Sequence, residues 1–175
     1  MKKLSGILNA ASVAGIAAYV IFLATYYVFG ANPFAGMQWV ATLVGLVIMY
    51  YTLKRFRDTE LEGFATYGQL LSPSWMYAFV FASMSGMLIY AHAWLVDDSF
   101  VEVVRISNLQ DLGEAKDVMI SLLGEEAYKL AVEELQKLDV TDIALSDFQM
   151  KFFLSFLTAF ILAAVIKRKP PVTEV

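Results

Sequence analysis

Four long apolar stretches, separated by polar segments, dominate the hydrophobic pattern of the chain. Residues 5–30, 33–53, 73–96 and 147–166 are each almost free of charged side chains. A helix of about 20 mostly apolar residues is long enough to cross the hydrocarbon core of a bilayer. The pattern therefore predicts an all-α integral membrane protein, folded as a four-helix bundle with four spans.

Helix-start signals precede three of these stretches. Asn32 and Ser72 are each followed by proline, which combines an N-cap residue with a first helical residue that needs no amide hydrogen. Residues 146–149 read Ser-Asp-Phe-Gln, the pattern of a capping box. The second and third spans are thus predicted to begin at the two prolines, and the fourth at Asp147.

The segment between the third and fourth stretches, residues 97–146, is acidic and favours helix. From Asp97 to Lys151 the chain holds thirteen acidic side chains against five basic ones. We expect helices over residues 114–123 and 125–138, with a stop at Gly124. Their apolar stripes would let this helical insert fold onto the bundle, bind another protein or stay partly disordered, and we favour docking on the chain's own bundle.

Composition supports a membrane protein and excludes several other classes. Of the 175 residues, 59% are hydrophobic and 17% are charged, and the mean hydropathy is +0.61. Soluble domains hold about 45–50% apolar and about 25% charged residues. The absence of cysteine excludes disulfides and thiolate metal sites, and a pI near 5.0 argues against nucleic acid as a partner.

Basic residues predict the orientation. They cluster before the first stretch, after the second and after the fourth, and with four spans these places share one side, which the positive-inside rule makes cytoplasmic. We therefore expect a bacterial inner-membrane protein with both termini in the cytoplasm and residues 97–146 outside it. A signal peptide also begins with lysines before an apolar run, but residues 5–30 are longer than such a run and lack a cleavage pattern, so we expect them to be retained. The basic clusters are Lys2 and Lys3; Lys54, Arg55 and Arg57; and Lys167, Arg168 and Lys169.

Small residues repeat every four positions along the stretches, a spacing that lets membrane helices approach closely. These ridges would either pack inside one bundle or leave one ridge free for a second copy or a partner subunit. We favour packing inside the chain. The ridges are Ala10, Ala14 and Ala18, with Ala11 and Gly15; Ala41 and Gly45; Ala78, Ala82 and Gly86; and Ala159 and Ala163.

Titratable side chains are sparse in the apolar stretches. We find none in the middle of a stretch, and we expect Lys151, about one turn inside the fourth, to reach the membrane interface. His92, the only histidine, is expected to be a hydrogen-bonded interfacial residue rather than a metal ligand or a pH sensor. Catalytic and phosphate-binding motifs are missing, so the sequence predicts no enzyme, no cofactor and no metal site. We expect Asn9, Ser83, Ser85, Ser155 and Thr158 to form hydrogen bonds between helices.

The link between the second and third stretches is the most distinctive segment, with a basic cluster, two glycines and a glutamine. We expect Arg57 and Asp58 to pair, the glycines to let the backbone turn, and the glutamine to cap a helix end. The basic cluster would anchor the topology, or the link would bind lipid headgroups or a cytoplasmic partner. The candidate contact residues are Lys54, Arg55, Arg57, Asp58, Gly63, Gly68 and Gln69.

This link resembles a bacterial membrane family catalogued as domain of unknown function four-one-nine-nine, common in the Bacteroidota. The resemblance lies in Tyr50-Tyr51, the basic run that ends at Arg57-Asp58, and the runs at 62–64 and 67–69. It extends to the plan of four spans, a long acidic insert before the last span and a lysine-rich end. The match departs at Leu70, where the family pattern has alanine. The resemblance implies a four-span membrane protein and no particular activity.

We interpret the chain as a non-catalytic accessory or scaffolding subunit that contacts other proteins through its helices and its insert. Its partners would be the lipid bilayer and a membrane protein or further copies of itself. One alternative is a small transporter or channel that works as an oligomer, with a path lined by Ser, Thr, Tyr and Asn9. Another is a sensor of lipid or envelope stress.

Overall fold

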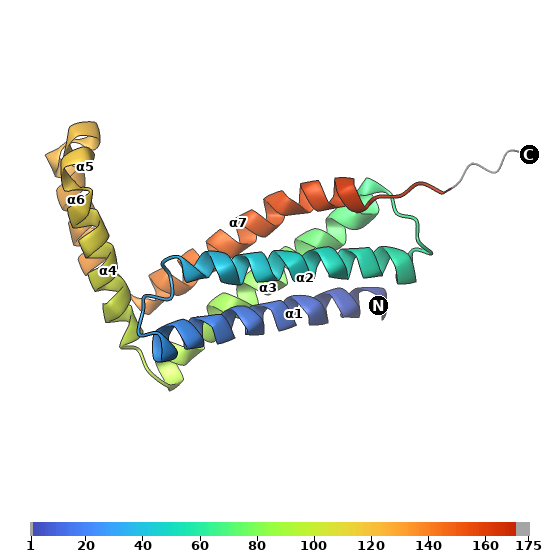
Figure 1. Ribbon diagram of the computed structural model, residues 1–175, viewed down its shortest axis with the longest axis horizontal. Helices are drawn as coiled ribbons and strands as arrows, with labels where there is room; N and C mark the ends of the chain where they lie inside the picture. The colour runs from blue at the N-terminus through green and yellow to red at the C-terminus, as the bar shows by residue number, and fades with distance from the viewer. Residues whose placement is uncertain (1, 171–175) are drawn as a thin grey trace, which may run out of the picture.

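The computed structural model describes residues 2–170, and this part of the chain is helical almost throughout (Figure 1). Residue 1, residues 171–175 and the side chains of Lys2 and Lys3 lie outside the described part, so the basic cluster expected there is not placed. The elements are α1 (Lys2–Leu23), a π-helical turn η1 (Ala24–Val28), α2 (Met37–Glu60), α3 (Tyr67–Leu95), α4 (Phe100–Glu114), α5 (Lys116–Leu123), α6 (Glu125–Gln136) and α7 (Val140–Ile166).

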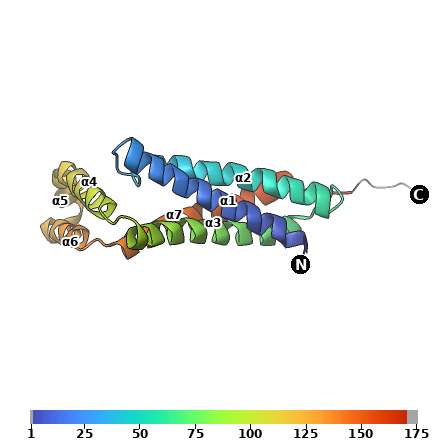
Figure 2. The same ribbon diagram turned by 90° about the horizontal axis from the view of Figure 1, so that it is seen from below.

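The four long helices α1, α2, α3 and α7 lie side by side (Figures 1 and 2). α3 packs against α7 and α1, and α1 packs against α2. The short helices α4, α5 and α6 form a separate unit, which we call the arm, at one end of the long helices. We call this the arm end, and the opposite end, where α1 begins and α7 ends, the pocket end.

Three of the long helices could cross a membrane by length and composition. They are α1 with η1 over Leu4–Val28, α3 over Tyr67–Leu95, and α7 over Val140–Ile166. α2 is not among them, because charged side chains begin at Lys54 and shorten its apolar part.

The small-residue ridges pack inside the chain. Ala11 and Ala14 are fully buried, and a Cβ atom added at Gly15 would lie 2.6 Å from the Cβ of Met84. At Gly45 an added Cβ would lie 2.3 Å from the ring of Phe81, so only glycine lets α2 and α3 approach this closely. The expectation that these ridges pack within one chain is therefore confirmed.

The second and third long helices do not begin at the predicted prolines. The Asn32 side chain accepts a hydrogen bond from the amide of Phe34 at 2.9 Å and closes a turn, and α2 begins only at Met37. α3 begins earlier than predicted, because Thr66 and Gln69 form a reciprocal capping box. Pro73 consequently lies inside α3, in its second turn.

The start of α7 is also earlier than predicted. Asp139 and Asp142 form a capping box through their side chains and backbone amides, at 3.0 Å in each direction. This box begins the helix at Val140, about two turns before the predicted box at residues 146–149. Asp147 therefore lies within the helix rather than at its start.

The arm differs from the predicted insert in two respects. Gly124 separates two helices with a positive φ of 88°, as predicted, but α4 was not predicted at all. Docking of the insert on the bundle is wrong for most of its length: only the first turns of α4 are buried, at Phe100 and Val104, and α5 and α6 hold no buried residue. The apolar stripe of α6 is used inside the arm, because α6 packs on α4 and α5.

Candidate functional site

Arg57 ties the end of α2 to the end of α7. Its guanidinium donates to the carbonyl oxygen of Ile166 at 2.9 Å and pairs with Asp58, with 2.6 Å between Nη2 and Oδ1. The carbonyl of Ile166 belongs to the last turn of α7, where helix carbonyls lack an internal partner. The predicted pairing of Arg57 with Asp58 is confirmed, and Arg57 in addition caps a neighbouring helix.

The turn from α2 to α3 uses one of the two predicted glycines. Gly63 has a φ of 83° and donates its amide hydrogen to the carbonyl of Arg57 at 3.0 Å. Gly68 has no turn role, since it lies in the first turn of α3. Gln69 caps a helix end as expected: its Oε1 accepts from the amide and the hydroxyl of Thr66 at 2.9 and 3.0 Å.

Backbone pairing joins this turn to the C-terminal segment. Ala65 and Arg168 exchange two backbone hydrogen bonds of 3.0 Å in an isolated antiparallel bridge. The guanidinium of Arg168 lies 5.9 Å from the ring centroid of Phe64, within reach of a cation–π contact. Two segments about a hundred residues apart in the sequence are thereby held side by side.

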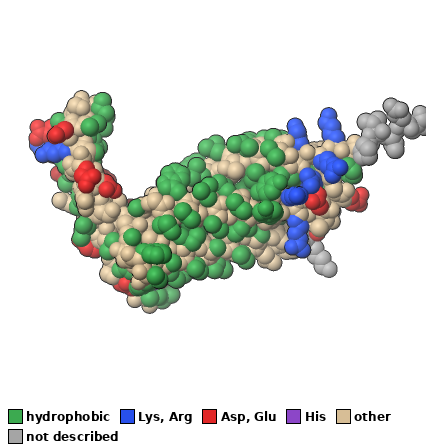
Figure 3. All heavy atoms as spheres, viewed as in Figure 1, with side chains coloured by type: hydrophobic (Ala, Val, Ile, Leu, Met, Phe, Trp, Pro, Cys, Tyr) green, Lys and Arg blue, Asp and Glu red, His purple; other side chains and the backbone are tan. Residues whose placement is uncertain are grey.

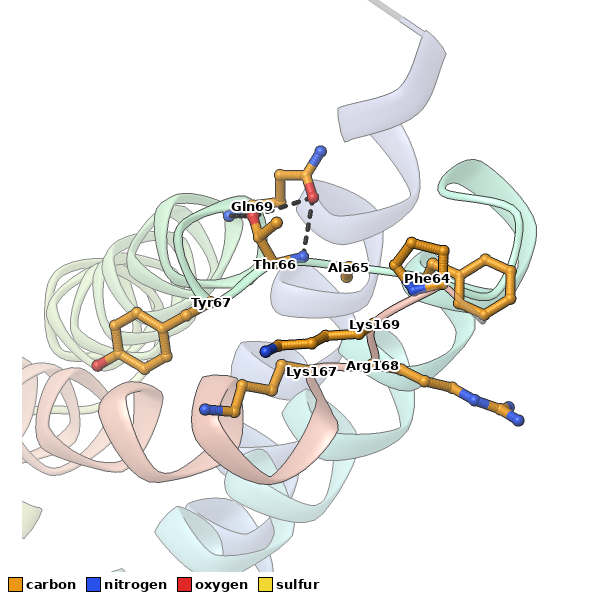
Figure 4. Close-up of a pocket in the computed structure, with 9 residues that line it drawn as sticks. Phe64, Ala65, Thr66, Tyr67, Gln69, Lys167, Arg168 and Lys169 are labelled. Atoms are coloured by element: carbon orange, nitrogen blue, oxygen red, sulfur yellow. Dashed lines mark hydrogen bonds between the residues drawn. The ribbon is translucent and has the colours of Figure 1, made fainter. Parts of the chain in front are cut away.

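A pocket of about 560 Å³, which we call the inner pocket, opens between these two segments (Figure 4). The side chains of Lys167 and Lys169 extend toward Tyr67, whereas Arg168 extends the other way, beneath Phe64. The N-terminus of α3 lies at the pocket wall and contributes the positive end of its helix dipole. The lining residues are Phe64, Ala65, Thr66, Tyr67, Gln69, Lys167, Arg168, Lys169 and Pro170.

The cations of the inner pocket have no acidic partner within residues 2–170. None of the ion pairs in this part of the chain includes Lys167, Arg168 or Lys169, and no acidic residue lines the pocket. A cavity with unpaired cations at one side and aromatic rings at another suits an anionic, amphipathic ligand.

Only one of the predicted contact residues lines this pocket. Gln69 does so, whereas Arg55 lines a different cavity of about 520 Å³ between α1 and α2, together with Asn9. The pocket cations Lys167 and Lys169 were predicted as topology anchors and not as site residues. The sequence signal for them was the basic cluster itself, but nothing in the sequence indicates that it meets the link.

Comparison with known proteins gives a family without a described activity. The model of the family described as "Protein of unknown function (DUF4199)" matches residues 9–168. The chain belongs to this family. No curated protein and no solved structure matches the chain.

The DUF4199 match includes both walls of the inner pocket, since it runs from α1 through the arm to Arg168. The predicted resemblance to this family is confirmed. The family description leaves the activity open, so the function rests on the geometry.

A buried ion pair lies between α3 and α7, where the sequence predicted no charge. Lys151 pairs with Asp147, and the carboxylate also accepts a hydrogen bond from the Ser85 hydroxyl at 2.7 Å. Lys151 lies roughly 16 Å along α7 from its first residue at 1.5 Å per residue, and its side chain is 3% exposed. The expectation that Lys151 reaches the interface is wrong, because a carboxylate on its own helix neutralises it in place.

A signal for this pair existed in the predicted ridge of Ala159 and Ala163. Extending that ridge by steps of four residues toward the N-terminus reaches Ser155, Lys151 and Asp147 in turn. All of these residues are buried against α3. Ser85 forms a hydrogen bond between helices as predicted, whereas the buried Ser155 hydroxyl has no hydrogen-bond partner within the described part of the chain.

A second polar cluster lies at the arm end. The Tyr19 hydroxyl lies 2.9 Å from Nδ1 of His92, and the Tyr27 hydroxyl lies 3.1 Å from Nε2. Tyr27 donates to Asp97 at 3.2 Å, which assigns the Nε2 hydrogen to His92 and leaves Nδ1 as the acceptor for Tyr19. Hydrogen bonds from Ser99 hold the pKa of Asp97 below its usual value. His92 is hydrogen-bonded as predicted.

Proposed function

We propose that the chain is a four-span, non-catalytic accessory protein of the bacterial inner membrane that binds the headgroup of an anionic phospholipid in the inner pocket. The unpaired cations of that pocket are the observation that carries the proposal. α2 would be the fourth span, because it packs along α1 and carries no charged side chain between Met37 and Leu53.

The distribution of charge supports a cytoplasmic pocket end. Figure 3 shows basic side chains gathered at the pocket end and acidic ones over the arm, and basic residues mark the cytoplasmic side of membrane proteins. Single cysteines at Thr59 and Ser121, introduced into a chain without native cysteine, would then react with an impermeant maleimide from opposite sides. Labelling of both from the same side of intact cells contradicts this topology.

The chemistry of the pocket suits a phospholipid better than a small soluble anion. Lys167 and Lys169 would neutralise a phosphate diester, and the rings of Phe64 and Tyr67 would cover the glycerol and the first carbons of the acyl chains. The pocket lies at the ends of apolar helices, at the level where lipid headgroups lie.

Native mass spectrometry of the purified protein with defined lipids tests this proposal. We expect phosphatidylglycerol or cardiolipin to bind at one saturable site and phosphatidylcholine to be excluded. Changing Lys167 and Lys169 together to glutamine should weaken binding by about tenfold or more, because each lysine near an anionic surface contributes about 1 kcal/mol.

The chain offers a matched control at the same end of the molecule. Changing Lys54 and Arg55 to glutamine removes the same charge, but neither residue lines the inner pocket. Equal loss of lipid binding in both double variants would show general surface attraction and contradict a built site. Competition by inorganic phosphate as effective as that by phosphatidylglycerol would show that the pocket binds phosphate and not lipid.

The accessory role draws support from a groove on the outer surface of α3 and α7. It has a volume of about 460 Å³, and its lining residues belong to two helices that could span the membrane. A transmembrane helix of a partner would fit against its aromatic rings. Co-purification from native membranes in mild detergent tests this role, and a monomer with no stoichiometric partner would contradict it. The groove is lined by Trp75, Met76, Phe79, Val80, Phe152 and Phe156.

Ion-coupled transport is the second candidate, and the buried Asp147–Lys151 pair is the observation that favours it. Ionisable residues at membrane depth are costly and often serve ion or proton pathways. Substrate-specific flux in proteoliposomes that is lost in an Asp147→Asn variant would support transport over the accessory role.

A further inference from the structure

The two helices at the tip of the arm, α5 and α6, differ in the side chains that they expose. α5 packs on α6, and its half-buried residues are Met119 and Ile120. Val118 and Leu122 lie one turn apart along α5, and they are 62% and 75% exposed. α5 therefore exposes an apolar strip, whereas its polar residues Asp117 and Ser121 lie on another side of the helix.

The outward side of α6 is mostly charged. Its half-buried residues, among them Ala131 and Leu135, face the rest of the arm. Glu126 and Glu133 lie on the opposite side and are exposed, with Leu130, which is 56% exposed, between them. The charged side of α6 therefore points away from the rest of the arm.

The arm also has a defined direction. It leaves the ends of the long helices sideways rather than continuing along them (Figure 1). In Figure 3 the apolar atoms at its tip gather on the side that faces along the long helices, and charged atoms gather on the far side. The root of the arm follows Trp94, Leu95 and Val96, which are 69–81% exposed and mark this end as a membrane interface.

We propose that α5 is a helix that lies in the membrane surface, which we call the foot. Its Val118 and Leu122 side chains would enter the outer leaflet, while α6 faces water. α4 has 15 residues and carries the tip roughly 22 Å from its root at 1.5 Å per residue. That length takes α5 past the chain's own helices and over the surrounding lipid. A short apolar helix held at headgroup level, with its charges turned away, is the arrangement of an interfacial amphipathic helix.

This inference rests on the long helices crossing the membrane, as proposed above, so its test includes a position within them. Single cysteines at Leu122, Glu126 and Val47 would carry a small fluorophore in the full-length protein, reconstituted in phosphatidylcholine vesicles. Val47 lies on α2 and is 55% exposed. Quenching by spin-labelled lipid and by aqueous iodide would be measured for each label.

We expect lipid quenching of the labels at Leu122 and Val47 and iodide quenching of the label at Glu126. If lipid quenches the label at Val47 but iodide quenches the label at Leu122, α5 does not lie in the membrane surface. The proposal of the foot is then wrong, whereas the proposed spans are supported. If the label at Val47 shows no lipid quenching, the proposed fourth span is wrong. A label at Leu122 that neither agent quenches would mean that protein covers α5, which also overturns the foot. A Val118→Cys variant repeats the measurement should Leu122→Cys fold poorly.

Discussion

Lys151 within α7 differs in burial and in ion pairing from the two lysines that follow this helix, Lys167 and Lys169. Lys151 lies in the middle of α7, is 3% exposed and is neutralised by Asp147. Lys167 and Lys169 follow the end of α7, line a cavity and have no acidic partner within residues 2–170. A charge that is paired and buried serves the packing of helices, whereas charges left unpaired at the surface of a cavity remain available for a ligand. The variants below test this contrast.

The largest effect is expected at the buried pair. A Lys151→Met variant leaves the carboxylate of Asp147 buried without its counter-charge, and we expect a loss of roughly 3–5 kcal/mol in the free energy of unfolding. The double variant with Asp147→Asn should recover most of this loss. Unfolding by denaturing detergent, followed by circular dichroism, measures both. A Lys151→Met variant as stable as the wild type would show that the pair does not stabilise the packing of α3 on α7.

An intermediate effect is expected at Arg57, which is partly exposed and partly paired. An Arg57→Met variant loses the hydrogen bond to the carbonyl of Ile166 and the contact with Asp58. We expect a loss of about 1–2 kcal/mol, since a hydrogen bond from a charged group is worth more than a neutral one and partial exposure reduces it. Arg55→Met, on the same turn of helix but with an exposed side chain, should change stability by less than about 0.5 kcal/mol. Equal losses in both variants would contradict the capping role of Arg57.

The sequence predicts the long helices better than it predicts either group of lysines. Four apolar stretches, the packing of the small-residue ridges and the stop at Gly124 follow from periodicity and residue size. The buried pair was missed because the capping pattern at residues 146–149 predicts that the helix starts there, whereas the capping box that forms lies at residues 139–142. The capping box at residues 139–142 places Asp147 inside α7, about two turns from its start.

The inner pocket could not be predicted, because its two walls are separated by the arm and by two long helices. The backbone bridge between Ala65 and Arg168 that joins them depends on α3 and α7 lying side by side. The prediction that the insert docks on the bundle was wrong for a similar reason, because the partner of α6 cannot be recognised in the sequence. The apolar stripe of α6 is visible in the sequence, but its partner, α4, has no clear stripe of its own.

A smaller effect is expected from pH at the arm end. The pKa of the Asp97 carboxyl lies below its usual value of 3.8 because Ser99 donates hydrogen bonds to it. Its ionised form therefore stabilises the fold above the pKa of the unfolded chain, and this contribution is lost as pH falls through the lower pKa of the folded chain. An Asp97→Asn variant should be less stable than the wild type at neutral pH and closer to it below about pH 3. A stability difference independent of pH would contradict this account.

The smallest effect on stability is expected where the effect on binding is largest. Lys167 and Lys169 pair with no acidic residue within residues 2–170 and project into a cavity, so changing both to glutamine should alter the free energy of unfolding by less than about 0.5 kcal/mol. Phosphatidylglycerol should raise the unfolding midpoint of the wild type by mass action, because it binds the folded protein. The midpoint of the double variant should not change with this lipid. Lys151→Met should show the reverse: a large loss of stability without lipid, and the same added stabilisation by lipid in whatever fraction remains folded. If the pocket lysines prove as important for stability as Lys151, they belong to the packing of the helix ends and not to a binding site.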